Sequence, residues 1–110
     1  MSTPTAHSLG HEVELPMAFD PAIEHVTAEL KKEGFGILSR IDVHLAFKEK
    51  LGKDFRRYAI LGACNPPLAF QALTTRPETG LLLPCNVTVE ETGPDACQGA
   101  EIIGKTFGKP

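Results

Sequence analysis

The chain has 110 residues, of which 42% are hydrophobic and 23% are charged, and its formal net charge is −3. This length suits one domain, and the apolar content excludes an intrinsically disordered chain. The longest apolar runs fall far short of the roughly 20 residues of a membrane span. A slightly acidic chain is also a poor candidate for general nucleic-acid binding. We therefore expect a small folded domain with neither a membrane nor a nucleic-acid partner.

The beginning of the chain carries neither the basic region nor the apolar stretch of a secretion signal. Three cysteines, an odd number, are too few for a disulfide scaffold. These features predict reduced thiols and a cytoplasmic location. We expect a disordered segment over 1–9, a single domain over 10–106 and a short tail over 107–110.

The first half of the domain has the clearest helix signals. Alternation of apolar and polar residues predicts a strand over His11–Met17. A helix follows near 20–33, with Asp20 as its N-cap, Pro21 in its first position and Gly34 as its left-handed stop.

A second strand and helix are expected next. The strand covers Phe35–Ile41, and Asp42 can cap a helix over 43–51 that ends at Gly52. The apolar residues of this helix are candidates for burial: Leu45, Phe47 and Leu51.

The remaining elements are one helix and three strands. A buried strand is expected over Arg57–Ala63 and a third helix over 66–74, capped by Asn65 with Pro66 in its first position. The longest strand is predicted over Leu81–Glu90, with Pro84 as a break or an edge position. The last two elements are a turn at Glu91–Asp95 and a strand over Ala100–Gly104.

Strands and helices alternate, which alone would favour a doubly wound parallel sheet. The second helix is short, however, and the hairpin expected near Gly93 is antiparallel. We therefore predict an α+β fold: a two-layer sandwich with three helices on one face of a small mixed sheet. Leu81–Val89 is apolar at nearly every position, which suits a strand covered on both faces and predicts a homodimer through the sheet surface.

The most informative residue is Cys64, which lies between a buried strand and the helix that begins after Asn65. Unpaired amides and the dipole at a helix N-terminus favour an anion such as a thiolate. Gly62 permits the close approach of a packing partner or a ligand. The alternative is that Cys64 is a small buried hydrophobic residue in a tight turn.

A second Cys-Asn pair, Cys85 and Asn86, also follows apolar residues. If the two strands are neighbours, the sulfurs of Cys64 and Cys85 can share a ligand or a bond, and Asn65 and Asn86 complete a ligand-binding site. Thiolates bind soft metals such as Cu(I), and they also form disulfides and persulfides. The alternative is that Cys85 fills a gap in the core and Asn86 hydrogen-bonds a turn.

Other polar residues carry weaker signals. No two of the four histidines lie at i, i+4 spacing within a predicted helix, as a helical metal pair would, and the sequence has no phosphate-binding glycine loop, nucleophile elbow or C-x-x-C motif. Arg56 and Arg57 are interpreted as a solvated pair, and the alternatives are that they pair with carboxylates or bring positive charge near Cys64. The sequence therefore assigns neither a catalytic residue nor a cofactor.

Several segments together resemble the domain of unknown function 302 family over roughly 29–90. The most specific are ACNPPLA and LLLPCNV, supported by KKEGFGIL at 31–38 and FKEKLGKDF at 47–55. The resemblance implies a small α+β domain, often dimeric, and brings no settled activity. The positions that match the family's motif are Cys64, Asn65, Pro66, Pro67, Cys85 and Asn86.

The end of the chain departs from the family's pattern. Similar domains close with an apolar strand and an Asp-Pro, whereas this chain ends TGPDACQGAEIIGKTFGKP. The final strand is therefore the least defined of the expected elements. Cys97, which has no counterpart in the motif, is interpreted as incidental.

Two functions are compatible with these features. In the first, Cys64 and Cys85 form a site for a sulfur species or a soft metal. In the second, the protein is a non-enzymatic binding or structural module, homodimeric, with both cysteines in the core. The accessibility of the two thiols distinguishes the two functions.

Overall fold

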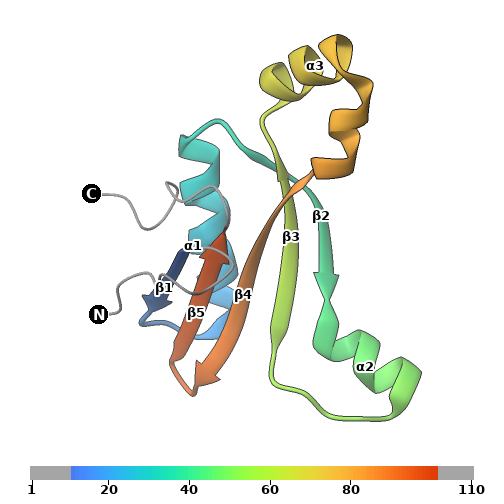
Figure 1. Cartoon of the computed structure of the whole chain (residues 1–110). Coiled ribbons are helices and arrows are strands. Elements are labelled where there is room, and N and C mark those ends of the chain that lie inside the picture. Colours follow the sequence, from blue (N-terminus) through green and yellow to red (C-terminus); the bar gives the residue numbers. More distant parts are fainter. Residues whose placement is uncertain (1–10, 102–110) are drawn as a thin grey trace.

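The computed structural model describes residues 11–101. Five strands form one sheet in the order β1-β5-β4-β3-β2 (Figure 1). They are β1 (His11–Leu15), β2 (Gly36–Asp42), β3 (Tyr58–Cys64), β4 (Cys85–Gly93) and β5 (Ala96–Glu101). The helices are α1 (Phe19–Lys32), α2 (Val43–Leu51), α3 (Pro66–Thr75) and the 3-10 helix η1 (Pro77–Leu82).

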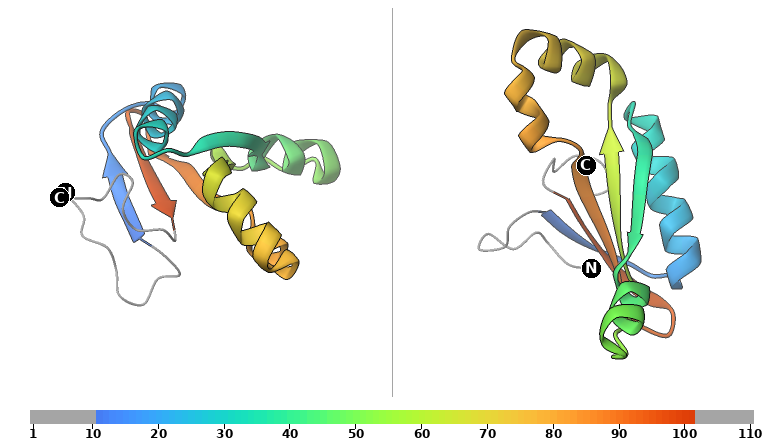
Figure 2. Two further views of the ribbon diagram at one scale, coloured as in Figure 1. Left: turned by 90° about the horizontal axis from the view of Figure 1, so that it is seen from above. Right: turned by 90° about the vertical axis from the view of Figure 1, so that its right-hand side faces the viewer.

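The α+β class is confirmed, but the predicted mixed sheet is wrong, because each neighbouring pair of described strands is antiparallel. It follows from this pairing that β1 and β2 run in the same direction at opposite edges of the sheet. Their connection must therefore cross the sheet, and α1 makes that crossing along one face (Figure 2).

The core lies between α1 and the central strands. Ile23, Val26 and Leu30 are buried at the predicted helical spacing. They pack against the residues of β3, β4 and β5 that alternate toward this face: Ala59, Leu61, Ala63, Val87, Val89 and Cys97. The intervening residues, such as Ile60 and Thr88, lie on the other face and are partly exposed.

The start of α1 differs from the prediction. The helix begins at Phe19 with Ala18 in the N-cap position, which provides no side-chain cap, so the predicted N-cap role of Asp20 is wrong. Asp20 lies instead in the first turn, where its negative charge is favourable to the helix dipole. The predicted end is confirmed, because Gly34 follows the helix with φ 88°.

The second helix also departs from the prediction. Asp42 makes no cap hydrogen bond, because its carboxylate accepts one from Arg40 Nε at 3.0 Å. Leu45 and Leu51 are 59% and 62% exposed, so their predicted burial is wrong, whereas Phe47 packs edge-on against Phe55. The cause is the direction of α2, which projects beyond the end of β2 (Figure 1).

The chain between β3 and β4 forms a projecting arm. The segment expected to begin the longest strand is η1 instead, and Pro84, joined to Leu83 by a cis peptide bond, is the predicted break before β4. Helix α3 packs chiefly against η1, and together they extend beyond the sheet (Figure 1). We call residues 66–82 the α3–η1 arm. The expectation of three helices on one face is therefore wrong, since α2 and α3 project from opposite ends of the sheet.

The final strand forms despite its atypical sequence. The hairpin expected near Gly93 is confirmed, and β5 lies between β1 and β4, earlier in the chain than predicted. Residues 102–104 of the predicted last strand, the segment 1–9 and the tail 107–110 lie outside the described residues. Within 11–101 there is no helix both long and apolar enough to cross a membrane.

The position of Leu30, fully buried at the end of α1, generates a test of the core. Leu30→Ala is expected to lower the free energy of unfolding by about 2–5 kcal/mol, because it removes a packed side chain and leaves a cavity. Glu24→Ala, at an exposed position of the same helix, is the control and should change it by less than about 0.5 kcal/mol. Urea denaturation measures both, and equal effects would contradict the assigned core.

Candidate functional site

Cys64 and Cys85 border one small pocket where the sheet meets the α3–η1 arm. Its volume is about 230 Å³, and its accessible lining is almost wholly apolar. The lining residues are Phe35, Ala63, Cys64, Asn65, Leu68, Ala69, Ala72, Leu83 and Cys85. We call this cavity the α3 pocket.

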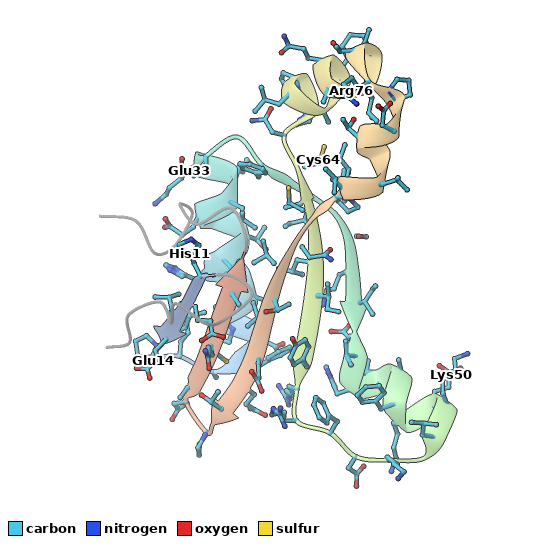
Figure 3. All side chains as sticks on the ribbon, viewed as in Figure 1. His11, Glu14, Glu33, Lys50, Cys64 and Arg76 are labelled. Atoms are coloured by element: carbon cyan, nitrogen blue, oxygen red, sulfur yellow. The ribbon has the colours of Figure 1, made fainter. Side chains whose placement is uncertain are left out.

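The two cysteines are diagonal neighbours across the β3–β4 pair. Ala63 lies directly opposite Cys85, and Cys64 is the next residue of β3. Side chains alternate along a strand, so Cys64 leaves β3 on the face opposite to that of Ala63 and Cys85. This alternation does not favour a direct disulfide, and both thiols are free and partly exposed. Figure 3 shows Cys64 at the end of the sheet nearest α3.

Asn65 is the predicted cap of α3. Its Oδ1 accepts a hydrogen bond from the backbone N–H of Leu68 at 3.2 Å, and Pro66 takes the first helical position. Its side-chain nitrogen lies close to Gly34, where an added Cβ would be only 2.9 Å from Nδ2. Asn65 therefore holds the start of α3 against the turn that leads from α1 into β2.

Asn86 is the predicted site residue that does not line the α3 pocket. It lies directly opposite Gly62 and is exposed. Alternation along β4 places it on the face opposite to that of Cys85. The structure therefore brings Cys64, Asn65 and Cys85 to one pocket and leaves Asn86 outside it.

The absence of a side chain at Gly62 predicted that a packing partner or a ligand approaches the backbone closely there. The groups that approach it are side chains of the protein itself. An added Cβ would lie 2.9 Å from Pro84 Cγ and still closer to Ser39 Oγ. Those two side chains cover the strand at this point, and Gly62 is buried beneath them. The glycine thus permits β2, β3 and the start of β4 to pack closely beside the pocket.

Among the residues that line the α3 pocket, those with polar or sulfur-bearing side chains are Cys64, Asn65 and Cys85, and none is charged. Within residues 11–101 no group of three or more His, Cys, Asp or Glu side chains is placed to hold a metal ion. Two sulfurs would suit a soft ion such as Cu(I), but strand alternation directs those of Cys64 and Cys85 to opposite faces of the sheet. They also fall short of the four ligands of a structural zinc site. The nucleophilic groups among the residues that line this pocket are therefore the thiols of Cys64 and Cys85.

Cys97 is not incidental, because its side chain is 1% exposed and belongs to the core. Burial raises the pKa of its thiol above the ordinary value, and the nearby Glu91 carboxylate adds to the effect. Its position opposite Leu15 and Glu91 in the sheet makes it a structural residue of β5.

The apolar walls of the pocket were not predicted as site residues. Leu68, Ala69 and Ala72 come from α3, where their i, i+1, i+4 spacing is that of one helix face. Phe35 and Leu83 come from the ends of separate loops. The helical spacing is a usable sequence signal, whereas the contribution of Phe35 and Leu83 depends on the folding of distant segments.

A family model described as "Domain of unknown function DUF302" matches residues 11–98. The chain belongs to the DUF302 family. It is similar to the crystal structure of an uncharacterized conserved protein DUF302 from Bacillus stearothermophilus, with 31% sequence identity and a TM-score of 0.73. The similarity covers 84% of this chain and 72% of that chain. None of the curated proteins compared matches significantly.

The DUF302 match extends beyond the 29–90 segment that carried the sequence resemblance. It includes β1 at its beginning and reaches Gln98 in β5 at its end. The atypical C-terminal sequence therefore still contributes a strand to the matched region.

The cap formed by Asn65 has a measurable consequence. Asn65→Ala is expected to lower the free energy of unfolding by about 1 kcal/mol, because it removes the acceptor for the Leu68 N–H. Asn86→Ala, at the corresponding residue of the second Cys-Asn pair, should cost less than about 0.5 kcal/mol. Chemical denaturation of both variants checks the difference, and a larger effect for Asn86→Ala would refute the structural role of Asn65.

The three cysteines should differ in their reaction with iodoacetamide. At pH 8 the folded protein is expected to be alkylated at Cys64 and Cys85, which are partly exposed, and not at Cys97. The raised pKa of Cys97 keeps it in the unreactive thiol form, and burial blocks the reagent. Peptide mass spectrometry, with and without denaturant, measures the extent of alkylation at each of the three cysteines. Alkylation of Cys97 first would contradict it.

Proposed function

We propose that the α3 pocket binds a small thiophilic ligand, either a sulfur species or a soft metal ion, through Cys64 and Cys85. The observation that carries this proposal is that two free, partly exposed thiols border one cavity of about 230 Å³. Thiolate sulfur is a soft ligand that selects soft partners. The site would thus take polarizable ligands in preference to hard ions or polar metabolites.

The size and walls of the pocket restrict the ligand. A volume of about 230 Å³ lies below the roughly 300–1,000 Å³ typical of sites for larger organic ligands. Leu68, Leu83 and Phe35 offer no side-chain hydrogen bonds, so a polar molecule that entered would lose its water contacts without replacement. These properties support a single ion or a ligand of a few atoms.

The reaction open to such a site with a sulfur species is transfer of a sulfane sulfur. A thiolate of Cys64 or Cys85 attacks the outer sulfur of a persulfide or polysulfide donor. The new S–S bond forms while the S–S bond of the donor breaks, and the donor leaves as a thiolate. This step needs no oxidant and leaves a persulfide on the cysteine.

The test of this proposal uses two probes, Cu(I) with a competing chromophoric chelator and inorganic polysulfide. The wild-type protein is expected to withdraw Cu(I) from the chelator or to gain the mass of one sulfur atom on Cys64 or Cys85. Cys64→Ser and Cys85→Ser should each weaken Cu(I) binding at least about tenfold, since each removes a thiolate ligand. With polysulfide, the variant that lacks the acceptor cysteine should no longer gain the sulfur atom.

Cys97→Ala is the matched control for both probes, because Cys97 is a core residue outside the α3 pocket. It should retain the wild-type behaviour in each assay. A wild-type protein that neither holds Cu(I) nor gains sulfur would refute the proposal. Variants of Cys64 and Cys85 that behave as wild type would refute it equally.

The second candidate is a non-enzymatic binding or structural module that functions as a homodimer. It is favoured by the large hydrophobic side chains exposed on β2, α2 and the α3–η1 arm. Thiols that remain inert toward reagents in the native protein, together with a dimeric mass, would support this function over the first. The cytoplasmic location and the lack of a nucleic-acid partner stay predictions.

A further inference from the structure

The exposed hydrophobic side chains are confined to one half of the described chain. Among residues 11–101, every large hydrophobic residue with a strongly exposed side chain lies between Leu38 and Leu82. Among residues 11–101, α1, β1, β4 and β5 contribute none of them. Figures 1 and 2 show that the contributing elements, β2, α2 and the α3–η1 arm, lie together on the side of the molecule away from β1 and β5.

This apolar half has three parts arranged along the edge of the sheet. At one end, Phe70 of α3 and Leu81 of η1 are 74% and 89% exposed. At the other end, Leu45 and Leu51 of α2 are 59% and 62% exposed. Between them lies β2, an edge strand with Leu38 at a bulge, 68% exposed. A gathering of exposed apolar side chains on one side of a protein is typical of an interaction site.

We propose that this surface docks a second copy of the chain across a two-fold axis perpendicular to β2, so that the α3–η1 arm of each copy packs against α2 of its partner. The inference rests on the homodimer of the second candidate function and specifies its interface. It does not depend on the thiol site.

Two-fold symmetry favours a second copy of the chain as the partner of this surface. A two-fold axis through β2 reverses the ends of the strand, so the arm of one copy meets the α2 end of the other. Both ends are apolar, which is the self-complementarity that an isologous interface requires. The two β2 edges then meet antiparallel, and backbone groups of an edge strand can pair with another strand.

The area and charge of the surface agree with this arrangement. The exposed parts of all ten of these side chains total on the order of 1,000 Å² per copy if a fully exposed Leu or Phe presents about 200 Å². This is the upper limit of their contribution to an interface, and a stable interface buries about 800 Å² per partner. The charges on β2 do not oppose the contact, because Arg40 and Asp42 form an ion pair within the chain at 3.0 Å.

The experiment is a complementation between two charged variants of the full chain, Phe70→Glu on the arm and Leu45→Lys on α2. Wild type is expected to have twice the 11.9 kDa monomer mass by light scattering at tens of micromolar. Each variant alone should dimerise at least about 30-fold more weakly, because both copies of the arm–α2 contact bury an unpaired charge.

An equimolar mixture of the two variants should regain the dimeric mass. The mixed dimer keeps one unchanged arm–α2 contact and places Glu opposite Lys in the other. Gln71→Glu, beside Phe70 on the same helix, is the control and should remain dimeric. Glu and Lys are both good helix formers, so circular dichroism should show the wild-type spectrum for every variant.

Several results would overturn the proposal. A wild-type mass of 11.9 kDa at these concentrations excludes the dimer. Dimeric single variants exclude the surface, and a mixture that stays monomeric excludes the contact between the arm and α2. Sedimentation of a monomeric wild-type protein with phospholipid vesicles would assign the apolar half to a lipid surface instead.

Discussion

The packing of α1 against one face of the sheet is the constraint on which the rest of this structure depends. The strands at the two edges, β1 and β2, run in the same direction, so the chain must cross the sheet between them, and α1 is that crossing. The buried stripe of the helix, including Val26 and Leu30, covers β3, β4 and β5 at their most apolar positions. Because α1 alone of the described helices covers this face of the sheet, α2 and α3 do not pack on it and extend from its two ends instead.

The location of the α3 pocket follows from that arrangement. β3 carries its chain out of the core at Cys64, and α3 begins immediately beyond it. The start of α3 is held by the Asn65 cap and by the contact of Asn65 with Gly34, while the rest of the helix packs chiefly on η1. The α3 pocket is therefore bordered by residues at the ends of β3 and β4 on one side and by one face of α3 on the other.

The same projecting elements explain why half of the molecule has an apolar exterior. Residues such as Leu81 and Leu45 would normally be covered by a neighbouring layer, but their helices lie beyond the sheet. While such side chains remain in water, the fold lacks the favourable free energy of burial, which is roughly 25 cal/mol per Å² of apolar surface. Covering these side chains would therefore add to the stability of the fold, and the α3 pocket lies beside them on the same arm.

Features whose causes act within a few residues could be predicted from the amino-acid sequence: the buried stripe of α1, the glycine stops at Gly34 and Gly52, the Asn65 cap and the break at Pro84. Tertiary structure decided the rest. Asp42 has a capping side chain but pairs with Arg40, and the apolar segment before Pro84 became η1 because it belongs to an arm and not to the sheet. The strand directions, the offset between Cys64 and Cys85, and the exclusion of Asn86 from the pocket all depend on the pairing of β3 with β4. Local sequence determines which residues alternate along each strand, but only contact between strands distant in sequence sets their register, and a shift of one residue moves every side chain to the other face.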